Sequence, residues 1–190
     1  MNIGLFFGSF NPVHSGHLII ANHILNTNDI NNIWFILSPQ NPFKTSSSLL
    51  DAQARFKLLE LATNDDQRFQ AKDIEFRLPK PSFTINTLLW VEEHFPGNNF
   101  SIIMGSDSFH TIDKWKDAEM IVSNYRMLVY QRPGFEIKDK VKGDIDILNA
   151  PLLGISSTEI RKLIKEGKSI RYLVPEAVRM EIAEKGYYKE

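Results

Sequence analysis

The sequence predicts an α/β protein whose mostly parallel sheet is covered by helices on both faces. Two apolar runs, 3–7 and 100–104, have almost no polar residue, as expected of strands buried on both faces. Such runs alternate along the chain with segments of helical periodicity. The 190 residues match the size of one domain with a sizeable core, and we find no internal repeat or low-complexity linker. We therefore expect a single domain over 1–190.

Each expected element follows from its local pattern. The expected strands are 3–7, 32–38, 100–104, 127–130 and 145–150, with 69–76 as a further extended segment. The expected helices are 17–25, 52–62, 84–95, 118–123, 157–166 and 175–185, and the last two pack on the rest of the domain. Loops rich in Gly, Pro, Asn and Ser separate them. In such sheets ligands bind beyond the carboxyl ends of the strands.

Composition narrows the classes of partner and chemistry. Lys plus Arg is 22 and Asp plus Glu is 23, a formal net charge of -1, so no basic surplus indicates nucleic acid or an anionic membrane. There is no cysteine, which excludes disulfides, thiolate metal sites and a cysteine nucleophile. The amino terminus lacks the pattern of a signal peptide and no apolar run approaches ~20 residues, so we expect a cytoplasmic protein. The oligomeric state stays open, a homo-oligomer included.

The first chemistry-bearing segment, 8–17 (GSFNPVHSGH), lies between an expected strand and an expected helix. Gly8 permits a tight turn and a close backbone approach. His14 and His17 are three residues apart, which places them on one face of a starting helix. Free N–H groups at a helix start attract phosphate, and two imidazoles there can donate hydrogen bonds to it. A lone histidine usually does no chemistry, but this cluster favours an anion site.

The second segment, 154–161 (GISSTEIR), has the pattern of a helix amino terminus. Ser156 and Glu159 fit a capping box. Ser157 and Thr158 then occupy the first turn, where N–H groups and hydroxyls can hold an anion, and Arg161 adds a charged fork one turn along. Alone, this pattern is more typical of an ordinary capped helix. Two anion sites at the same sheet edge together indicate a triphosphate.

These segments carry a family resemblance. Residues 14–17 resemble the HxGH signature of the nucleotidylyltransferase superfamily, which is similar to the HIGH motif of class I aminoacyl-tRNA synthetases, and residues 155–161 resemble its ISSTxIR motif. The resemblance implies a Rossmann-like fold of the HUP type and nucleotidyl transfer without a covalent intermediate. It implies catalytic roles for His14, His17 and Arg161. The residues it implies for ATP binding are Gly8, Ser9, Phe10, His14, His17, Gly105, Asp107, Arg132, Ile155, Ser156, Ser157, Thr158 and Arg161.

Three further segments resemble motifs of bacterial nicotinate-nucleotide adenylyltransferases. Residues 41–44 (NPFK) are similar to the PPHK loop, 81–88 (PSFTINTL) to SYTxDTL, and 105–107 to the GxD loop that precedes a tryptophan. The departures from these motifs are Phe43, Phe83 and Asn86. On the residues alone, Thr84 is expected to cap the helix that follows it. The residues that the resemblance implies for acceptor binding are Lys44, Ser82, Phe83, Thr84, Asp107 and Trp115.

The resemblance implies transfer of AMP from ATP to nicotinic acid mononucleotide, with Mg²⁺ carried in on ATP and no metal ligand assigned to the chain. The nearest alternative is an adenylyltransferase for nicotinamide mononucleotide or phosphopantetheine. A cytidylyltransferase is disfavoured because no RTEGIST-like stretch precedes Ser156, and a tRNA synthetase because no KMSKS-like loop is visible. A non-catalytic nucleotide sensor or a purely structural domain are alternatives of another class, and pyrophosphate release separates them from an enzyme.

Overall fold

The computed structural model describes residues 1–40, 49–137, 143–151 and 154–189. Six strands form one sheet in the order β3-β2-β1-β4-β5-β6, and each neighbouring pair is parallel. The strands are β1 (Asn2–Gly8), β2 (Asn32–Leu37), β3 (Phe69–Lys72), β4 (Asn99–Gly105), β5 (Arg126–Tyr130) and β6 (Ile145–Leu148). The predicted fold class is confirmed, and the described sheet is parallel throughout rather than mostly parallel.

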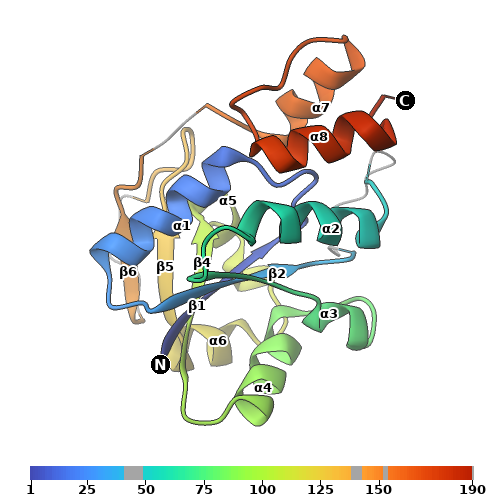
Figure 1. Ribbon diagram of the computed structural model, residues 1–190. Helices are drawn as coiled ribbons and strands as arrows, with labels where there is room; N and C mark the ends of the chain where they lie inside the picture. Colours follow the sequence, from blue (N-terminus) through green and yellow to red (C-terminus); the bar gives the residue numbers. More distant parts are fainter. Residues whose placement is uncertain (41–48, 138–142, 152–153, 190) are drawn as a thin grey trace.

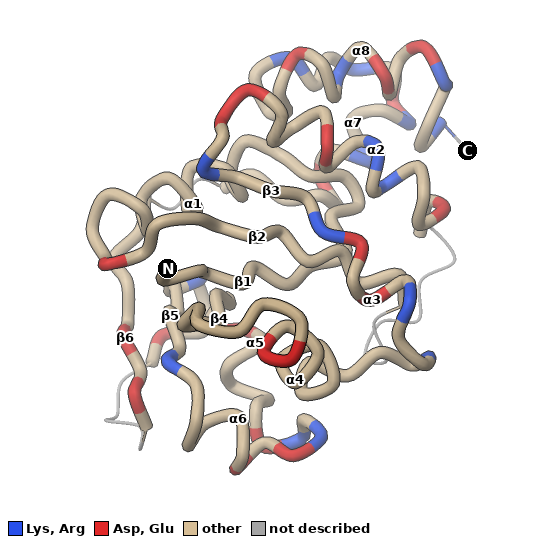
Figure 2. The backbone as a smooth tube through the Cα atoms, turned by 60° about the horizontal axis from the view of Figure 1, so that its bottom comes forward, with Lys and Arg blue, Asp and Glu red and all other residues tan. Residues whose placement is uncertain are grey.

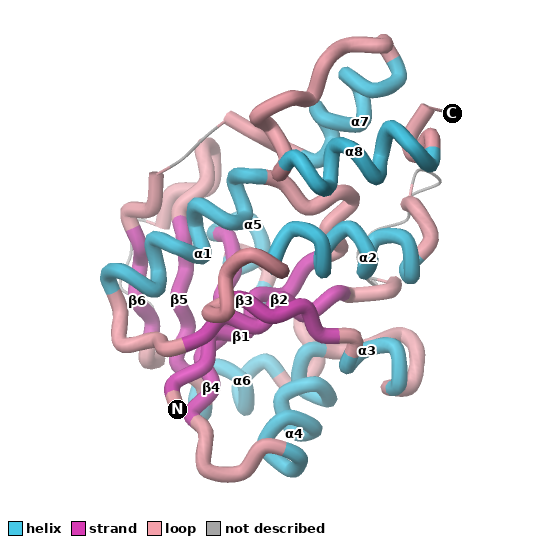
Figure 3. Tube along the Cα trace, viewed as in Figure 1, coloured by secondary structure: helices cyan, strands magenta, loops and turns pink. Residues whose placement is uncertain are grey.

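Helices cover both faces of this sheet (Figures 1 and 3). On one face lie α1 (Ser15–Thr27), α2 (Ala52–Thr63), α7 (Ser157–Lys165) and α8 (Glu176–Lys185). On the other lie α3 (Ile74–Arg77), α4 (Thr84–His94) and α6 (Ala118–Asn124). The short α5 (Ser106–Phe109) and a 3₁₀ turn (Ile112–Lys114) follow β4 directly. Helix α8 packs on α2, so the carboxyl-terminal helices are part of the first layer.

The sheet separates two apolar cores because its strand residues alternate between faces. Phe6 and Ile103 face the layer of α1 and α2, whereas Leu5 and Ile102 face the layer of α4 and α6. All four are 2% exposed or less. Burial on both faces explains why these strands are apolar throughout in the sequence.

Charged residues lie mostly on the helices and loops, with both signs interspersed (Figure 2). The strands β1, β2 and β4 carry none. In the described part of the chain, no helix combines the length and apolarity that crossing a bilayer requires.

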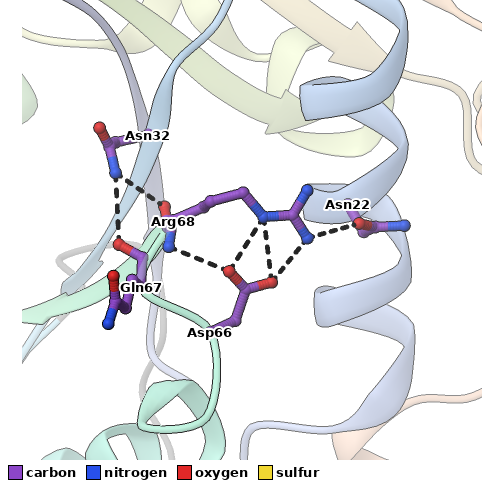
Figure 4. A network of polar contacts seen from close by, with 5 residues as sticks. All are labelled: Asn22, Asn32, Asp66, Gln67 and Arg68. Atoms are coloured by element: carbon purple, nitrogen blue, oxygen red, sulfur yellow. Dashed lines mark hydrogen bonds and ion pairs between the residues drawn. The ribbon is translucent and has the colours of Figure 1, made fainter.

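A polar network occupies the sheet edge at which β2 and β3 begin (Figure 4). Arg68 pairs with Asp66 at 2.7 Å and donates to Asn22 Oδ1 of α1 at 3.1 Å. Asn32, the first residue of β2, donates to the carbonyl oxygens of Gln67 and Arg68. Exposed pairs of this kind contribute little stability. The network ties α1, β2 and β3 together at the edge opposite to the carboxyl ends of the strands.

The predicted elements differ from the structure mainly around residue 73. The extended segment expected over 69–76 ends at Lys72, and Ile74–Arg77 forms α3 instead. Four residues are too few to show helical periodicity, which also explains why α5 and the 3₁₀ turn were not predicted. The strand expected over 145–150 ends at Leu148, α7 ends one residue earlier than expected, and α8 begins at Glu176 because Pro175 is its N-cap.

Candidate active site

A cleft of about 600 Å³ opens at the carboxyl edge of the sheet. It lies at the ends of β1 and β4, the neighbouring strands at which the strand order changes direction, where α/β sheets bind their ligands. Its lining comes from the turn after β1, the loops after β4 and β5, the start of α4 and the first turns of α7. Segments far apart in the sequence therefore meet in one place.

The turn after β1 is shaped by Phe10, whose backbone is left-handed at φ 40°. Its ring packs against Phe6 and His17, with centroids 6.0 and 5.1 Å away, and is 2% exposed. A side chain on Gly8 would place its Cβ 2.8 Å from this ring, so the turn requires glycine there. Because the Phe10 ring belongs to the core, the contact with ATP predicted for this residue would be made by its backbone.

His14 and His17 lie stacked at the start of α1, with ring centroids 3.7 Å apart. His14 is the N-cap, and its backbone N–H donates to His17 Nδ1 at 3.2 Å. Because His17 Nδ1 accepts this bond, its neutral ring carries the proton on Nε2. Both histidines line the cleft. The two imidazoles therefore lie on one face, as predicted. The backbone N–H of His14 fixes the tautomer of His17.

His14 is buried and uncharged at neutral pH. Burial, helped by the positive charge of Arg132, lowers the pKa of His14 from 6.5 to about 4. Its Nδ1 has no hydrogen-bond partner within the described ranges, and it lies 3.0 Å from where a Cβ on Gly16 would be. A neutral His14 ring can donate one hydrogen bond, and the glycine between the histidines makes room for that ring.

Helix α7 is fastened to the turn after β1 by two side chains. The Ser157 hydroxyl donates to the carbonyl oxygen of Pro12 at 2.8 Å. Arg161 donates from one nitrogen to the carbonyl oxygen of Asn11 at 2.7 Å and from another to Thr158 Oγ1 at 3.3 Å. The two segments that the sequence predicts to face one cleft do so.

The amino terminus of α7 is capped largely as expected. Ser156 Oγ accepts from the Glu159 N–H at 3.2 Å. Since the Ser157 hydroxyl proton is engaged by Pro12, an anion there would meet the free N–H groups of the first turn. Ile155 packs against the core and is not among the described residues that line the cleft, so its contact with ATP stays a prediction.

The loops after β4 and β5 are held together by Arg132. Its guanidinium pairs with Asp107 at 2.8 Å, and its backbone N–H donates to the buried Ser106 Oγ at 2.8 Å. A side chain on Gly105 would collide with Asp107 and crowd Arg132. Asp107 and Arg132 therefore form one unit at the cleft wall, and their contacts with ribose and adenine stay predictions.

Among the residues predicted to bind the acceptor, those at the start of α4 differ from expectation. Phe83, not Thr84, is the N-cap, because Phe83 has the extended backbone and Thr84 is already helical. The phenyl ring of Phe83 cannot accept a hydrogen bond as a cap does, so the first N–H groups of α4 are left for other partners. The Ser82 hydroxyl donates to Glu75 at 2.7 Å. Lys44, together with Phe43, lies outside the described residues.

Trp115 is half-buried, lines the cleft and packs partly against the second core. Its neighbour Lys116 also lines the cleft, with Nζ 5.2 Å from the centre of the Phe83 ring. The sequence analysis missed Lys116, which its place beside Trp115 could have indicated. It also missed Ser38 and Glu75, which line the cleft. No group of three or more metal-ligating side chains is found in the part of the chain that the structure describes.

A further missed residue, Arg55, lies beneath the cleft and is 1% exposed. Its guanidinium donates to four carbonyl oxygens, those of Leu50 (2.8 Å), Ser9 (2.7 Å), Ser38 (3.0 Å) and Pro39 (2.8 Å). These carbonyls belong to the loops after β1 and β2, so one side chain fixes both. An arginine on the apolar face of an amphipathic helix was the available signal.

A parallel sheet of this order, with two segments that can hold an anion facing one cleft at the change of strand order, indicates a nucleotide-binding protein of the nucleotidyl-transferring class. The chain belongs to the cytidylyltransferase-like family, whose sequence model matches residues 5–163.

Full-length relatives agree with this assignment. The chain is 45% identical to a "probable nicotinate-nucleotide adenylyltransferase" of Cytophaga hutchinsonii, over 99% of this chain and 98% of that one. It is 44% identical to a protein of the same name from Flavobacterium johnsoniae over the whole of both chains. Among solved structures, the nicotinic acid mononucleotide adenylyltransferase of Plasmodium falciparum complexed with NaAD matches with a TM-score of 0.81 at 23% identity, covering 98% of this chain and 97% of that one.

Proposed function

We propose that the protein is a nicotinate-nucleotide adenylyltransferase, which transfers AMP from ATP to nicotinic acid mononucleotide and yields deamido-NAD and pyrophosphate. Two relatives with names of this kind are 44–45% identical to this chain over 99–100% of its length. The observation that carries the proposal is the attachment of α7 to the turn after β1 through Ser157 and Arg161. It brings two anion-binding segments to one cleft, as a triphosphate donor requires.

In the proposed reaction, an oxygen of the acceptor's 5′-phosphate attacks the α-phosphorus of ATP. A new oxygen–phosphorus bond forms, and the bond from the α-phosphorus to the oxygen bridging to the β-phosphorus breaks. That oxygen keeps the bonding electrons and leaves with pyrophosphate. A phosphate monoester is already a nucleophile near neutral pH, so catalysis rests on positioning and on neutralising charge on the leaving phosphates.

The donors at the cleft suit this task. His17, with its proton on Nε2, and the neutral His14 can donate to phosphate oxygens. Arg161 adds a permanent positive charge, and the free N–H groups at the start of α7 add backbone donors. ATP would enter with Mg²⁺ on its phosphate oxygens, since that ion prefers phosphate and water ligands.

The other end of the cleft would take the pyridine nucleotide. Trp115 offers a flat face for the pyridine ring, and the start of α4 at Phe83 and Thr84 offers N–H groups for its carboxylate. Asp107 would accept from a ribose hydroxyl, with Lys44 contributing to phosphate binding as the family motif implies. Because it draws on ATP, the enzyme would work in the cytoplasm.

A pyrophosphate-release assay with three acceptors side by side tests the proposal. With ATP present, we expect the highest kcat/KM on nicotinic acid mononucleotide, and lower values on nicotinamide mononucleotide and phosphopantetheine. Preference for either of the other two would reassign the acceptor. Binding of ATP without pyrophosphate release on any acceptor would indicate a nucleotide sensor instead of an enzyme.

A further inference from the structure

Glu75, in the short helix α3, is a buried carboxylate behind the acceptor side of the cleft. It is 2% exposed and still contributes to the cleft wall. Its Oε2 accepts from the Ser82 hydroxyl at 2.7 Å, and its Oε1 accepts from the Thr87 hydroxyl at 3.1 Å. The side chain of Ser38 gives it a further hydrogen bond. The partners that the described residues give it are all neutral hydroxyl donors.

These three hydroxyls come from separate parts of the chain. Ser38 follows β2 at the sheet edge, Ser82 lies just before α4, and Thr87 lies in the first turn of that helix. Through Glu75, the amino terminus of α4 is therefore tied to α3 and to the sheet. Thr87 is fully buried and is not among the described residues that line the cleft. Its bond to Glu75 would therefore affect the acceptor nucleotide only through the position of α4, not by direct contact.

A buried carboxylate of this kind is costly for the fold. Burial raises the pKa of Glu75, and the hydroxyl bonds oppose that rise. An apolar or amide side chain in the same place would avoid the desolvation cost. Groups that lower stability while adjoining a cleft are characteristic of functional positions.

We propose that Glu75 is a positioning residue for the acceptor nucleotide. It holds the turn from Ser82 to Thr84 against the sheet edge, so that Phe83 and the first N–H groups of α4 face the cleft. The Ser82 hydroxyl proton is spent on Glu75, so the acceptor's carboxylate meets the backbone of this turn. The inference rests on the proposed function. It adds to that function a role for Glu75, which lies outside the sequence motifs of the family.

The primary variant is Glu75→Gln, which keeps the shape but replaces one acceptor oxygen by a donor. One of the Ser82 and Thr87 hydroxyls then faces an amide N–H, so it can no longer donate there and must turn to accept. We expect the KM for nicotinic acid mononucleotide to rise about tenfold, the scale for losing one hydrogen bond to a charged group, while the KM for ATP changes little. The midpoint of thermal unfolding should stay the same or rise, because a buried charge has been removed.

Thr87→Val provides a second, nearly isosteric variant that removes one donor far from any substrate. It should raise the acceptor KM in the same way, and the double variant should have nearly the effect of Glu75→Gln alone, since both changes break one network. Glu60→Gln, at an exposed position of α2, is the matched control and should leave both KM values unchanged.

Calorimetric titration with nicotinic acid mononucleotide gives a readout that needs no turnover. An unchanged Kd in Glu75→Gln overturns the positioning role, as does an equal rise of both KM values together with a lower unfolding midpoint. Failure of the proposed function looks different: the unmodified protein itself would release no pyrophosphate with any acceptor, whereas failure of the Glu75 proposal leaves the unmodified protein active and the variant unchanged in Kd.

Discussion

A guanidinium nitrogen of Arg161 lies 2.7 Å from the carbonyl oxygen of Asn11, although 150 residues separate the two in the sequence. This bond places the carboxyl-terminal helix α7 against the turn that follows the first strand. His17 and Arg161 consequently line the same cleft. Had they lain on opposite sides of the molecule, no single triphosphate could contact both.

Replacing Arg161 by lysine should slow the reaction while keeping the charge. Lysine cannot contact Asn11, Thr158 and a phosphate with one planar fork. We expect kcat/KM for ATP to fall roughly 10²-fold, the scale for losing one transition-state donor, as measured by pyrophosphate release. Arg179→Lys, which changes a partly exposed arginine of α8 that pairs with Glu176, should leave the rate unaltered. A normal rate in Arg161→Lys would show that charge alone suffices there.

His17→Ala should lower turnover by roughly 10²-fold or more, because it removes a donor aimed at the phosphates. His23, on the same helix but outside the described cleft lining, supplies the control variant His23→Ala. Single-turnover measurements with saturating ATP would separate the chemical step from binding. An intact rate in His17→Ala would remove this residue from the mechanism.

Gly16→Ala should separate activity from stability. Alanine favours a helix by about 1 kcal/mol over glycine, yet its Cβ would lie 3.0 Å from His14 Nδ1 and displace that ring. We expect slower pyrophosphate release with little loss of stability toward urea. Gly154→Ala is the control, because a Cβ there meets no atom within 4 Å among the described residues. Equal activities in the two variants would contradict the role given to the His14 ring position.

His14 should make the fold more stable as the pH rises from about 4 to 6.5. In this interval the unfolded chain, with an ordinary pKa of 6.5, binds a proton that the folded protein with its pKa of about 4 does not. Acidification across the interval should therefore cost up to about 3 kcal/mol. Urea unfolding of the unmodified protein and of His14→Gln at both ends of the interval measures this difference. An NMR titration that places the His14 pKa near 6.5 would refute it.

Trp115→Ala should chiefly raise the KM for the acceptor. Stacking of a ring on an aromatic side chain contributes about 1–3 kcal/mol, or roughly tenfold or more in affinity. Trp90→Ala, at a half-buried tryptophan that stacks on His94 outside the described cleft lining, controls for the loss of apolar packing. An effect confined to ATP kinetics would contradict the stacking role.

The sequence predicted those features that depend on local pattern. The shared helix face of the two histidines and the cap at Ser156 follow from spacing, and the meeting of their segments follows from the topology of parallel sheets. The cap at Thr84 was wrong because residue type alone does not say which backbone turns helical first. Glu75 escaped because α3 is too short to show a period. Arg55 was missed although its place on the apolar face of α2 was a signal, because its partners are backbone carbonyl groups, which no sequence pattern marks.

The hydrogen bonds of Arg55 to backbone carbonyl groups affect which substitutions the cleft can tolerate. A carbonyl group is present at every position whatever the side chain, so the anchoring of both loops by Arg55 does not depend on the identity of Ser9, Ser38 or Leu50. Substitutions of these residues can therefore change the side chains near the cleft while Arg55 keeps both loops in place. The guanidinium at position 55 holds both loops through their backbone, whichever side chains those residues carry.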